Sequence, residues 1–388
     1  MSAKRRKTMS EAELDVSRRD DDASTTSNAS EEITHNNIPP LASIPPELFD
    51  EIMSYFPILP LTWYYGTSPT KVPDLRFFER TCILRVLSLT CGALRRITLP
   101  RLWSRLDTCC VPENWRRVWY KYIMQALKRK ADGVAAADPS LRVHVRLSSR
   151  TLAIELSKFE YKNILPSIPK LLLSLPSLHT IQILNLSTPG EFGRLLVGLS
   201  LPRVRTLVIP TDAGSLIRAC PNVTHVRCAE GTGIALIGAL KHCKCEVLDG
   251  MIDWVKEPKL MQRLVNSAPK LATLEMRHPV RWGTDPDYLN LSTYIAPAKW
   301  AQIIPTASGL KNLRTFILTF ATAKEAPSDI ISVAAAREVL MNSALPGTKK
   351  LVVRRILPPH YAELAPPYVV VDEELMSSVT EIITPSGY

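Results

Sequence analysis

Cysteine side chains are the first candidates for chemistry in this chain, because four of them lie close together in the sequence. One histidine joins them, and the group comprises Cys220, Cys228, His242, Cys243 and Cys245. Structural zinc sites use paired cysteines with about two to four residues between them, together with a second such pair. The spacing here lacks those pairs, and Cys220 and Cys228 also fill apolar positions of a predicted strand. We therefore expect buried thiols and no metal site.

A short glycine motif offers a second chemistry. Gly231 and Gly233 follow a predicted strand and precede a predicted helix, as they would in a dinucleotide-binding turn. The third glycine of that fingerprint would stand where the chain has Leu236. A strand-to-helix turn that needs a permissive backbone explains both glycines equally well. We expect no cofactor.

Motifs for self-contained catalysis are missing from the sequence. It has no G-x-S-x-G elbow, no H-E-x-x-H, no phosphate-binding loop and no carboxylate pair at an informative spacing. Its histidines are isolated from one another. We therefore predict that the protein is not an enzyme and has no catalytic residues.

A basic and aromatic segment at 113–133 raises the question of nucleic-acid binding. Lys121, Lys128, Arg129 and Lys130 lie beside a helical stripe of aromatic and apolar residues, a mixture found in nucleic-acid-binding proteins. The net charge of +11 gives the same weak hint, because total charge does not locate a site. An ordinary amphipathic helix explains the pattern more simply, so nucleic acid is not the expected partner.

Composition is typical of a soluble intracellular protein. The 388 residues are 46% hydrophobic, which allows a substantial core, and no apolar run reaches the ~18 residues of a membrane span. No secretory signal follows the basic N-terminus, and the eight cysteines are irregularly spaced, as reduced thiols are. Residues 1–40 are too polar to fold and are predicted to be disordered. The basic cluster Lys4–Lys7 is a candidate nuclear localisation signal, so we expect a cytoplasmic location, a nuclear one, or both.

Three short helices are predicted between residues 44 and 103. Pro45 and the proline after it suit a helix's first turn, and apolar residues then recur every four positions from Leu48. The second helix is predicted at 79–98, ended by Pro100, and a short third helix follows. These helices carry more apolar surface than they can bury among themselves, which indicates a partner.

The same segment resembles an F-box. The family pattern starts with an apolar residue and proline, continues through a leucine–small–cysteine segment and ends at an apolar–Trp pair; "IPPELFDEIMSYFP" and "VLSLTCGALRRITLPRLW" match it. The resemblance implies docking on the Skp adaptor of a cullin–RING ubiquitin ligase. An insert at about 58–78 departs from the family and could alter or block part of that surface. The residues assigned to adaptor binding are Ile44, Pro45, Leu48, Ile52, Leu87, Leu89, Leu94 and Trp103.

A repeated phrase marks the second half of the chain. "LPSLHTIQI" (175–183), "LPRVRTLVI" (201–209), "CPNVTHVRC" (220–228) and "APKLATLEM" (268–276) share one frame, and "LKNLRTFIL" (310–318) repeats it with lysine in place of proline. The alternating apolar positions predict a strand with one buried face. Helix-like segments lie between the phrases, and a degenerate copy is predicted at 243–251. Further strands are predicted at 141–147, 349–356 and 368–372.

A strand and a helix every 20 to 29 residues is the period of leucine-rich repeats. The phrases lack the asparagine that such repeats usually carry, so we expect an irregular, leucine-rich-repeat-like solenoid. The predicted fold class is α/β, in three parts. A disordered tail spans 1–40, an F-box-like helical domain spans 41–106, and a linking helix with the solenoid spans 107–388.

The combination resembles long F-box proteins whose repeat-containing C-terminal halves select a substrate, a family abundant in fungi. It implies a substrate-receptor subunit of a Skp–cullin–F-box ubiquitin ligase. The expected partners are the adaptor with its cullin complex and an unidentified protein substrate, with no membrane. The alternative is a non-catalytic repeat scaffold whose helical cap merely protects the first repeat. The two differ in one observable, because a cap buries Leu48, Ile52 and Leu89, whereas a docking helix leaves part of that face open.

Overall fold

The computed structural model describes residues 43–56, 76–108, 119–137, 139–229, 231–250, 254–255, 257, 259–277, 299–320, 326–343, 347–356 and 368–376. The chain divides into two compact units, Met1–Ser43 and Ile44–Tyr388, and the architecture described here belongs to the second. The predicted tail at 1–40, with the Lys4–Lys7 cluster, lies outside the described residues, as does most of the insert at 58–78.

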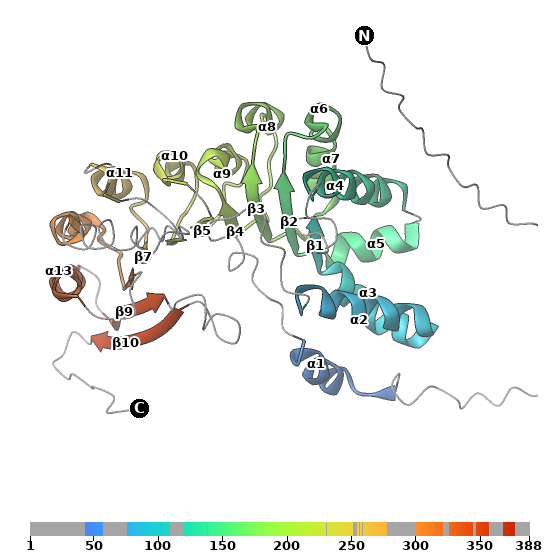
Figure 1. The fold of residues 1–388 in the computed structure, drawn as a ribbon, viewed down its shortest axis with the longest axis horizontal. Coiled ribbons are helices and arrows are strands. Elements are labelled where there is room, and N and C mark those ends of the chain that lie inside the picture. Colours follow the sequence, from blue (N-terminus) through green and yellow to red (C-terminus); the bar gives the residue numbers. More distant parts are fainter. Residues whose placement is uncertain are drawn as a thin grey trace, which may run out of the picture. The chain divides into compact units, whose positions relative to one another are not determined.

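One sheet of ten strands organises the second unit (Figure 1). The strands follow one another across the sheet in chain order, β1 to β9 in parallel and β10 antiparallel to β9. The fold is therefore α/β with a nine-stranded parallel sheet. The strands are β1 (Arg105–Thr108), β2 (Thr151–Leu156), β3 (Thr180–Leu186), β4 (Thr206–Ile209), β5 (His225–Cys228), β6 (Val247–Gly250), β7 (Thr273–Arg277), β8 (Thr315–Phe320), β9 (Lys349–Ile356) and β10 (Tyr368–Met376).

The sequence phrases lie in register in this sheet. Each phrase ends in one strand, and β6 takes the place of the degenerate copy predicted at 243–251. The sixth residues of the five full phrases are side by side, and the degenerate copy at 243–251 joins this row with its fifth residue, one position off the predicted alignment. Their row runs through Thr180, Thr206, His225, Val247, Thr273 and Thr315.

Every phrase opens with the same turn. The carbonyl oxygen of the first residue accepts a hydrogen bond from the amide of the fourth, at 3.1 Å between Leu175 and Leu178 and at 3.2 Å between Leu201 and Val204. Proline suits the second position of such a turn because its φ is already fixed near the required value. The first and fourth side chains are buried in the large core. The turn therefore positions each strand in the sheet with the same face toward the core.

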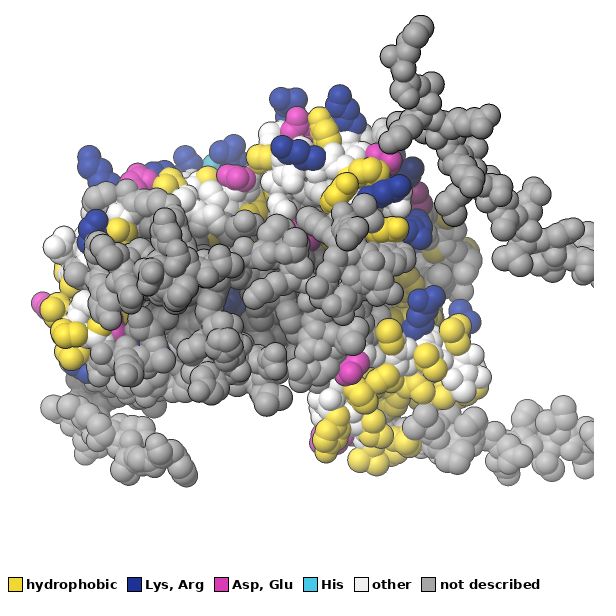
Figure 2. All heavy atoms as spheres, viewed as in Figure 1, with side chains coloured by type: hydrophobic (Ala, Val, Ile, Leu, Met, Phe, Trp, Pro, Cys, Tyr) yellow, Lys and Arg dark blue, Asp and Glu magenta, His cyan; other side chains and the backbone are white. Residues whose placement is uncertain are grey.

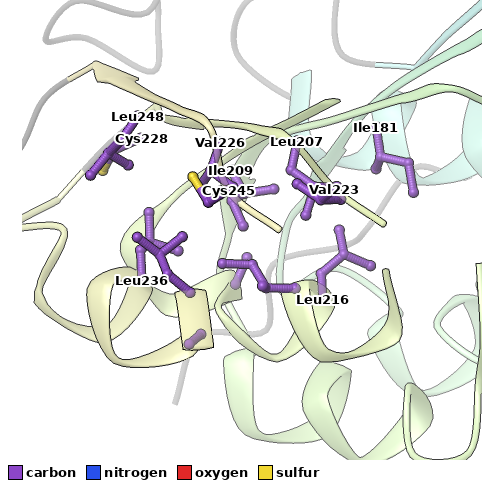
Figure 3. Close-up of a cluster of buried hydrophobic side chains, with 14 of the residues drawn as sticks. Ile181, Leu207, Ile209, Leu216, Val223, Val226, Cys228, Leu236, Cys245 and Leu248 are labelled. Carbon is purple, nitrogen blue, oxygen red and sulfur yellow. The ribbon is translucent and has the colours of Figure 1, made fainter. Parts of the chain in front are cut away.

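Helices between the strands cover one face of the sheet (Figure 1). Alternate strand side chains point toward these helices, and Figure 3 shows Leu216 and Leu236 of two helices facing Leu207, Val226 and Leu248 of the strands. The elements are α4 (Trp119–Ala136), α5 (Pro139–Ser148), α6 (Tyr161–Ile164), α7 (Ser167–Ser174), α8 (Pro189–Leu195), η4 (Thr211–Ala213), α9 (Ser215–Ala219), α10 (Ile234–Ala239), η5 (Leu240–His242), α11 (Leu260–Ser267), η7 (Ile304–Gly309) and α13 (Pro327–Met341).

The strand predicted at 141–147 is wrong, because these residues lie inside α5 and the next strand begins at Thr151. Alternating valines suggested a strand, yet only Val145 is buried, at 1% exposed. Pro139 starts the helix, where a missing amide costs nothing. Arg142 then donates to the Ala137 carbonyl oxygen at 2.8 Å, which ties α5 to the end of α4. Tertiary packing overrides local strand preference here.

The single helix predicted at 79–98 is also wrong, since two helices occupy this region: α2 (Arg76–Thr90) and α3 (Gly92–Trp103). Cys91 between them is extended, with φ −155°, and its Sγ accepts a hydrogen bond from the Leu94 amide at 3.5 Å. Cys91 thus caps a new helix. Pro100 lies inside α3 rather than ending a helix, and Trp103 belongs to α3 rather than to a separate third helix.

Other expectations are confirmed. The strands predicted at 349–356 and 368–372 are β9 and β10. The two glycines of the apparent nucleotide motif have the left-handed backbone of a turn, with φ 90° at Gly231 and 74° at Gly233. A Cβ at Gly231 would lie 2.8 Å from the Thr211 Oγ1, so this turn requires glycine for packing as well as conformation. Among the described helices, none is long and apolar enough to cross a membrane.

Candidate docking surface

Helix α1 (Pro46–Ser54) carries apolar side chains on two faces. Phe49 and Met53, one turn apart, are 2% and 1% exposed and form a small core with Leu84 of α2. Leu48 and Ile52, also one turn apart, are 56% and 43% exposed. A surface helix needs only one apolar stripe to pack on its own protein. The second stripe is left without a partner among the described residues.

Arg80 of α2 fixes the end of α1. Its Nη1 donates to the carbonyl oxygens of Met53 and Phe56, the latter at 2.9 Å. The last carbonyls of a helix have no intrahelical partner, so this guanidinium replaces the missing donors. The contact holds the C-terminal end of α1 on α2.

Arg101 of α3 fixes the other side of α1. It donates two hydrogen bonds to the Asp50 carboxylate, at 2.7 and 2.9 Å. Its guanidinium carbon also lies 5.0 Å from the centre of the Phe49 ring. The hydrogen bonds and positive charge of Arg101 hold the pKa of Asp50 below its usual value. With both arginines in place, the rotation of α1 is set, and Leu48 and Ile52 face outward.

Further exposed apolar side chains lie on and beside α1 and α2, the helices that form this small core. Tyr55, just past α1, is 76% exposed, and on α2 Val86 and Leu89 are 63% and 74% exposed. Figure 2 shows hydrophobic side chains gathered over the region of α1 to α3. Patches of this kind mark interaction sites in soluble proteins. We call the set the docking face, comprising Leu48, Ile52, Tyr55, Val86 and Leu89.

The structure divides the sequence-predicted adaptor residues into two groups. Leu48, Ile52 and Leu89 lie on the docking face, and Pro45 is exposed directly before α1. The others are covered to different degrees by the chain itself. Ile44 and Leu87 pack partly against the small core, Leu94 is 2% exposed, and Trp103 packs against the large core.

Sequence reasoning missed two members of the docking face. Tyr55 follows Ile52 by three residues, and Val86 precedes Leu89 by three, so both lie on the helical stripes already identified. The same spacing could have found them. Conversely, Leu94 is buried and Trp103 is partly buried against the large core. The sequence did not reveal this, because apolar periodicity does not distinguish a residue that faces the core from one that faces outward.

The docking face is attached to the sheet through the end of α3. Trp103 packs against the large core, and its carbonyl oxygen accepts a hydrogen bond from the Ser149 Oγ at 3.0 Å. After Ser104 the chain enters β1, and the Ser104 carbonyl accepts from the amides of Arg150 and Thr151 at 2.9 and 3.1 Å. The helical segment therefore runs directly into the first parallel strand pair, across the boundary predicted at 106.

The cysteine group belongs to the core of the repeats. Cys220, Cys228 and Cys245 are at most 2% exposed, and Figure 3 shows Cys228 and Cys245 among buried aliphatic side chains. Burial raises the pKa of the Cys220 thiol to about 12, so it is a neutral packing group rather than a thiolate ligand. In the part of the chain that the structure describes, no group of three metal-binding side chains is found.

Helix α4 has the burial pattern of an amphipathic helix. Ile123, Met124 and Leu127 are at most 2% exposed and pack in the core, whereas Lys121 and Lys128 are exposed. Trp115 of the predicted aromatic stripe lies outside the described residues. The buried apolar side chains of α4 thus have a structural explanation that requires no bound base.

Comparisons with known proteins do not assign the chain to a family. No protein-family model matches the chain, and a search of curated proteins finds no match.

Proposed function

We propose that this protein is a substrate-receptor subunit of a Skp–cullin–F-box ubiquitin ligase. The single observation that carries the proposal is the exposure of Leu48, Ile52 and Leu89, which a protective cap would have buried. Exposed aliphatic and aromatic side chains on two helices provide the apolar centre that a stable protein interface needs. Helices α1 to α3 act as the F-box-like element, and the docking face binds the Skp-type adaptor.

The repeats supply the second binding function in this proposal. Parallel strands in chain order, with a helix between successive phrases, support an irregular leucine-rich-repeat-like solenoid. The shared hydrogen-bond register of the phrases and their common opening turn support the same interpretation. A protein substrate binds to residues of this part that do not face the core.

The proposed receptor performs no covalent step of its own. It holds the substrate and the adaptor on one chain, which raises the effective concentration of substrate lysines near the ligase's ubiquitin carrier. The direct connection from α3 to β1 suits this role, because a stiff connection limits the positions that the substrate can occupy.

A matched pair of substitutions tests the proposal. Leu48 and Ile330 are both 56% exposed, but Ile330 lies on α13, far along the chain from the docking face. Leu48→Asp places a charge in the interface and is expected to weaken capture by immobilised Skp adaptor about tenfold or more. Ile330→Asp is expected to leave capture unchanged. If the folded Leu48→Asp protein is captured as well as the original chain, the docking role is excluded.

The rival function is a repeat scaffold that binds other proteins without a ubiquitin ligase. Co-purification of the full chain from native extract, followed by mass spectrometry, separates the two. The proposal predicts adaptor and cullin among the recovered proteins, and their loss with Leu48→Asp. Recovery of other partners alone, unchanged by that substitution, would favour the scaffold.

A further inference from the structure

A cavity of about 230 Å³ opens between the first two phrase turns, at the edge of the sheet where the strands begin. Its wall comes from the end of α7 and from two successive turns, and most of it is leucine and proline. We call it the edge groove. It is lined by Leu172, Leu173, Leu175, Pro176, Leu178, Ser200, Leu201, Pro202, Arg203 and Val204. Leu173 is 61% exposed at its mouth.

Arginine and histidine side chains follow the edge of the sheet at which the groove opens. Arg150, His179 and Arg205 occupy the residues directly before β2, β3 and β4, and all three are exposed. Their main chains are joined in series, since the Arg150 carbonyl accepts from the His179 amide at 2.9 Å and the His179 carbonyl accepts from the Arg205 amide at 2.8 Å. Neighbouring strands lie about 4.8 Å apart, so these side chains form a closely spaced row. Arg203 adds a fourth basic group at the rim.

These basic side chains are held in place rather than neutralised. Arg203 donates to the Pro176 carbonyl oxygen at 3.1 Å, and Arg205 donates to the Asn222 carbonyl oxygen at 3.0 Å. Each guanidinium has five N–H donors, so most of them still face solvent. Within the described residues, neither arginine forms an ion pair with an aspartate or glutamate, and the same holds for Arg150. The row is a pre-positioned set of donors for carboxylates.

We infer that the edge groove binds an acidic peptide segment that carries one large apolar side chain. The apolar side chain enters the cavity beside Leu173, and flanking carboxylates accept hydrogen bonds from Arg203 and Arg205. Guanidinium groups match carboxylates in geometry as well as charge. Nucleic acid fits less well, because the lining has no aromatic side chain on which a base could stack. This site is separate from the docking face, and the inference does not depend on the proposed ligase role.

Fluorescence polarisation with the full chain tests this inference. The probe is a short fluorescein-labelled peptide of aspartate, glutamate and glycine with one central phenylalanine, and the reference probe has serine instead of phenylalanine. The phenylalanine peptide is expected to bind at least about tenfold more tightly, with affinity that falls as salt is raised. Equal affinity for both peptides, or no binding of either, would overturn the inference.

Two substitutions locate the binding. Leu173→Asp changes a side chain that is already exposed, so the fold should persist while phenylalanine-peptide affinity falls about tenfold. Arg203→Glu is expected to weaken binding at least as much, and Arg129→Glu on exposed α4 is the control with the same change in net charge. Arg203→Lys, which keeps the charge, should retain more affinity than Arg203→Glu. Affinity that responds equally to the Arg203 and Arg129 reversals would show non-specific attraction and refute the site.

Competition with an unlabelled single-stranded oligonucleotide tests whether the edge groove binds nucleic acid instead of an acidic peptide. The acidic peptide site predicts that the oligonucleotide displaces the phenylalanine peptide only weakly and that Leu173→Asp does not alter its own binding. An oligonucleotide that binds more tightly than the peptide, at the same arginines, would replace this inference with nucleic-acid binding.

Discussion

Two adjacent residues of α1 provide a sharp test of how the docking face is built. Phe49 and Leu48 are similar in size and hydrophobicity, yet Phe49 is 2% exposed and Leu48 is 56% exposed. Phe49→Ala removes a buried ring from the small core, whereas Leu48→Ala removes a side chain that is less than half covered. The two substitutions should therefore differ greatly in their effect on α1.

The expected magnitudes follow from burial. Truncation of a buried phenylalanine typically costs about 3–5 kcal/mol, and loss of the Arg101 contact adds about 0.5–1 kcal/mol. Full burial of a leucine contributes about 1.5–3 kcal/mol, so the partly covered Leu48 contributes about 1 kcal/mol or less. Each 1.4 kcal/mol corresponds to about a tenfold change in an equilibrium constant. Local opening of α1 should increase at least about 100-fold for Phe49→Ala and less than about tenfold for Leu48→Ala.

Hydrogen–deuterium exchange of the α1 amides measures that opening directly, because local unfolding sets the exchange rate. The exchange of amides in β3 and β4 serves as an internal control that neither substitution should change. Equal acceleration of α1 by both substitutions would mean that Leu48 is covered by the chain itself. The docking face would then not exist as described.

Three further predictions concern charge, backbone and thiols. Arg101 lowers the pKa of Asp50 from its ordinary 3.8, so the pair stabilises α1 above that pH, and the contribution is lost as the pH falls through the lower folded pKa. Because Asp50 is 59% exposed, the contribution is under about 1 kcal/mol. Hydrogen exchange of the α1 amides should lose this acid dependence in Asp50→Asn. Gly250 has φ 95°, and a Cβ there would lie 2.2 Å from the Cys228 carbonyl oxygen. Gly250→Ala should therefore lower the unfolding temperature by several degrees, whereas Gly92→Ala, where the space is open, should not. Equal shifts in unfolding temperature would contradict the tight approach of β5 and β6. Native protein should expose Cys82 but not Cys220 to a thiol reagent at pH 8, because burial raises the pKa of Cys220 to about 12; rapid modification of Cys220 would refute its burial.

The strands β3 to β8 of the parallel sheet were predictable because their signal is a shared phrase rather than a local preference. Proline at the second position and apolar residues at the first, fourth, seventh and ninth fix a turn and a strand face together. The row through Thr180, Thr206 and His225 follows directly from the alignment of the phrases. The antiparallel pairing of β10 with β9 was not predictable, because strand direction depends on the connection and not on the alternation of residues within 368–376.

The errors arose where neighbours decide the local structure. The 141–147 segment alternates as a strand does, but packing against α3 and the Arg142 contact to α4 select a helix. A helix period across 79–98 hides the break at Cys91, because the residues on both sides of the break keep the apolar spacing. Within the docking face, spacing identified Leu48, Ile52 and Leu89 but could not show that Leu94 turns inward. On α1, the packing of Phe49 and Met53 against Leu84 and the contacts of Arg80 and Arg101 separate the inward face from the outward one.

Isothermal titration calorimetry of the purified full chain with a purified Skp adaptor tests the central claim most directly. The account predicts binding at one to one, with a negative heat-capacity change from apolar burial, that is lost in Leu48→Asp and retained in Ile330→Asp. Absence of binding by the original chain, or undiminished binding by folded Leu48→Asp, would contradict it.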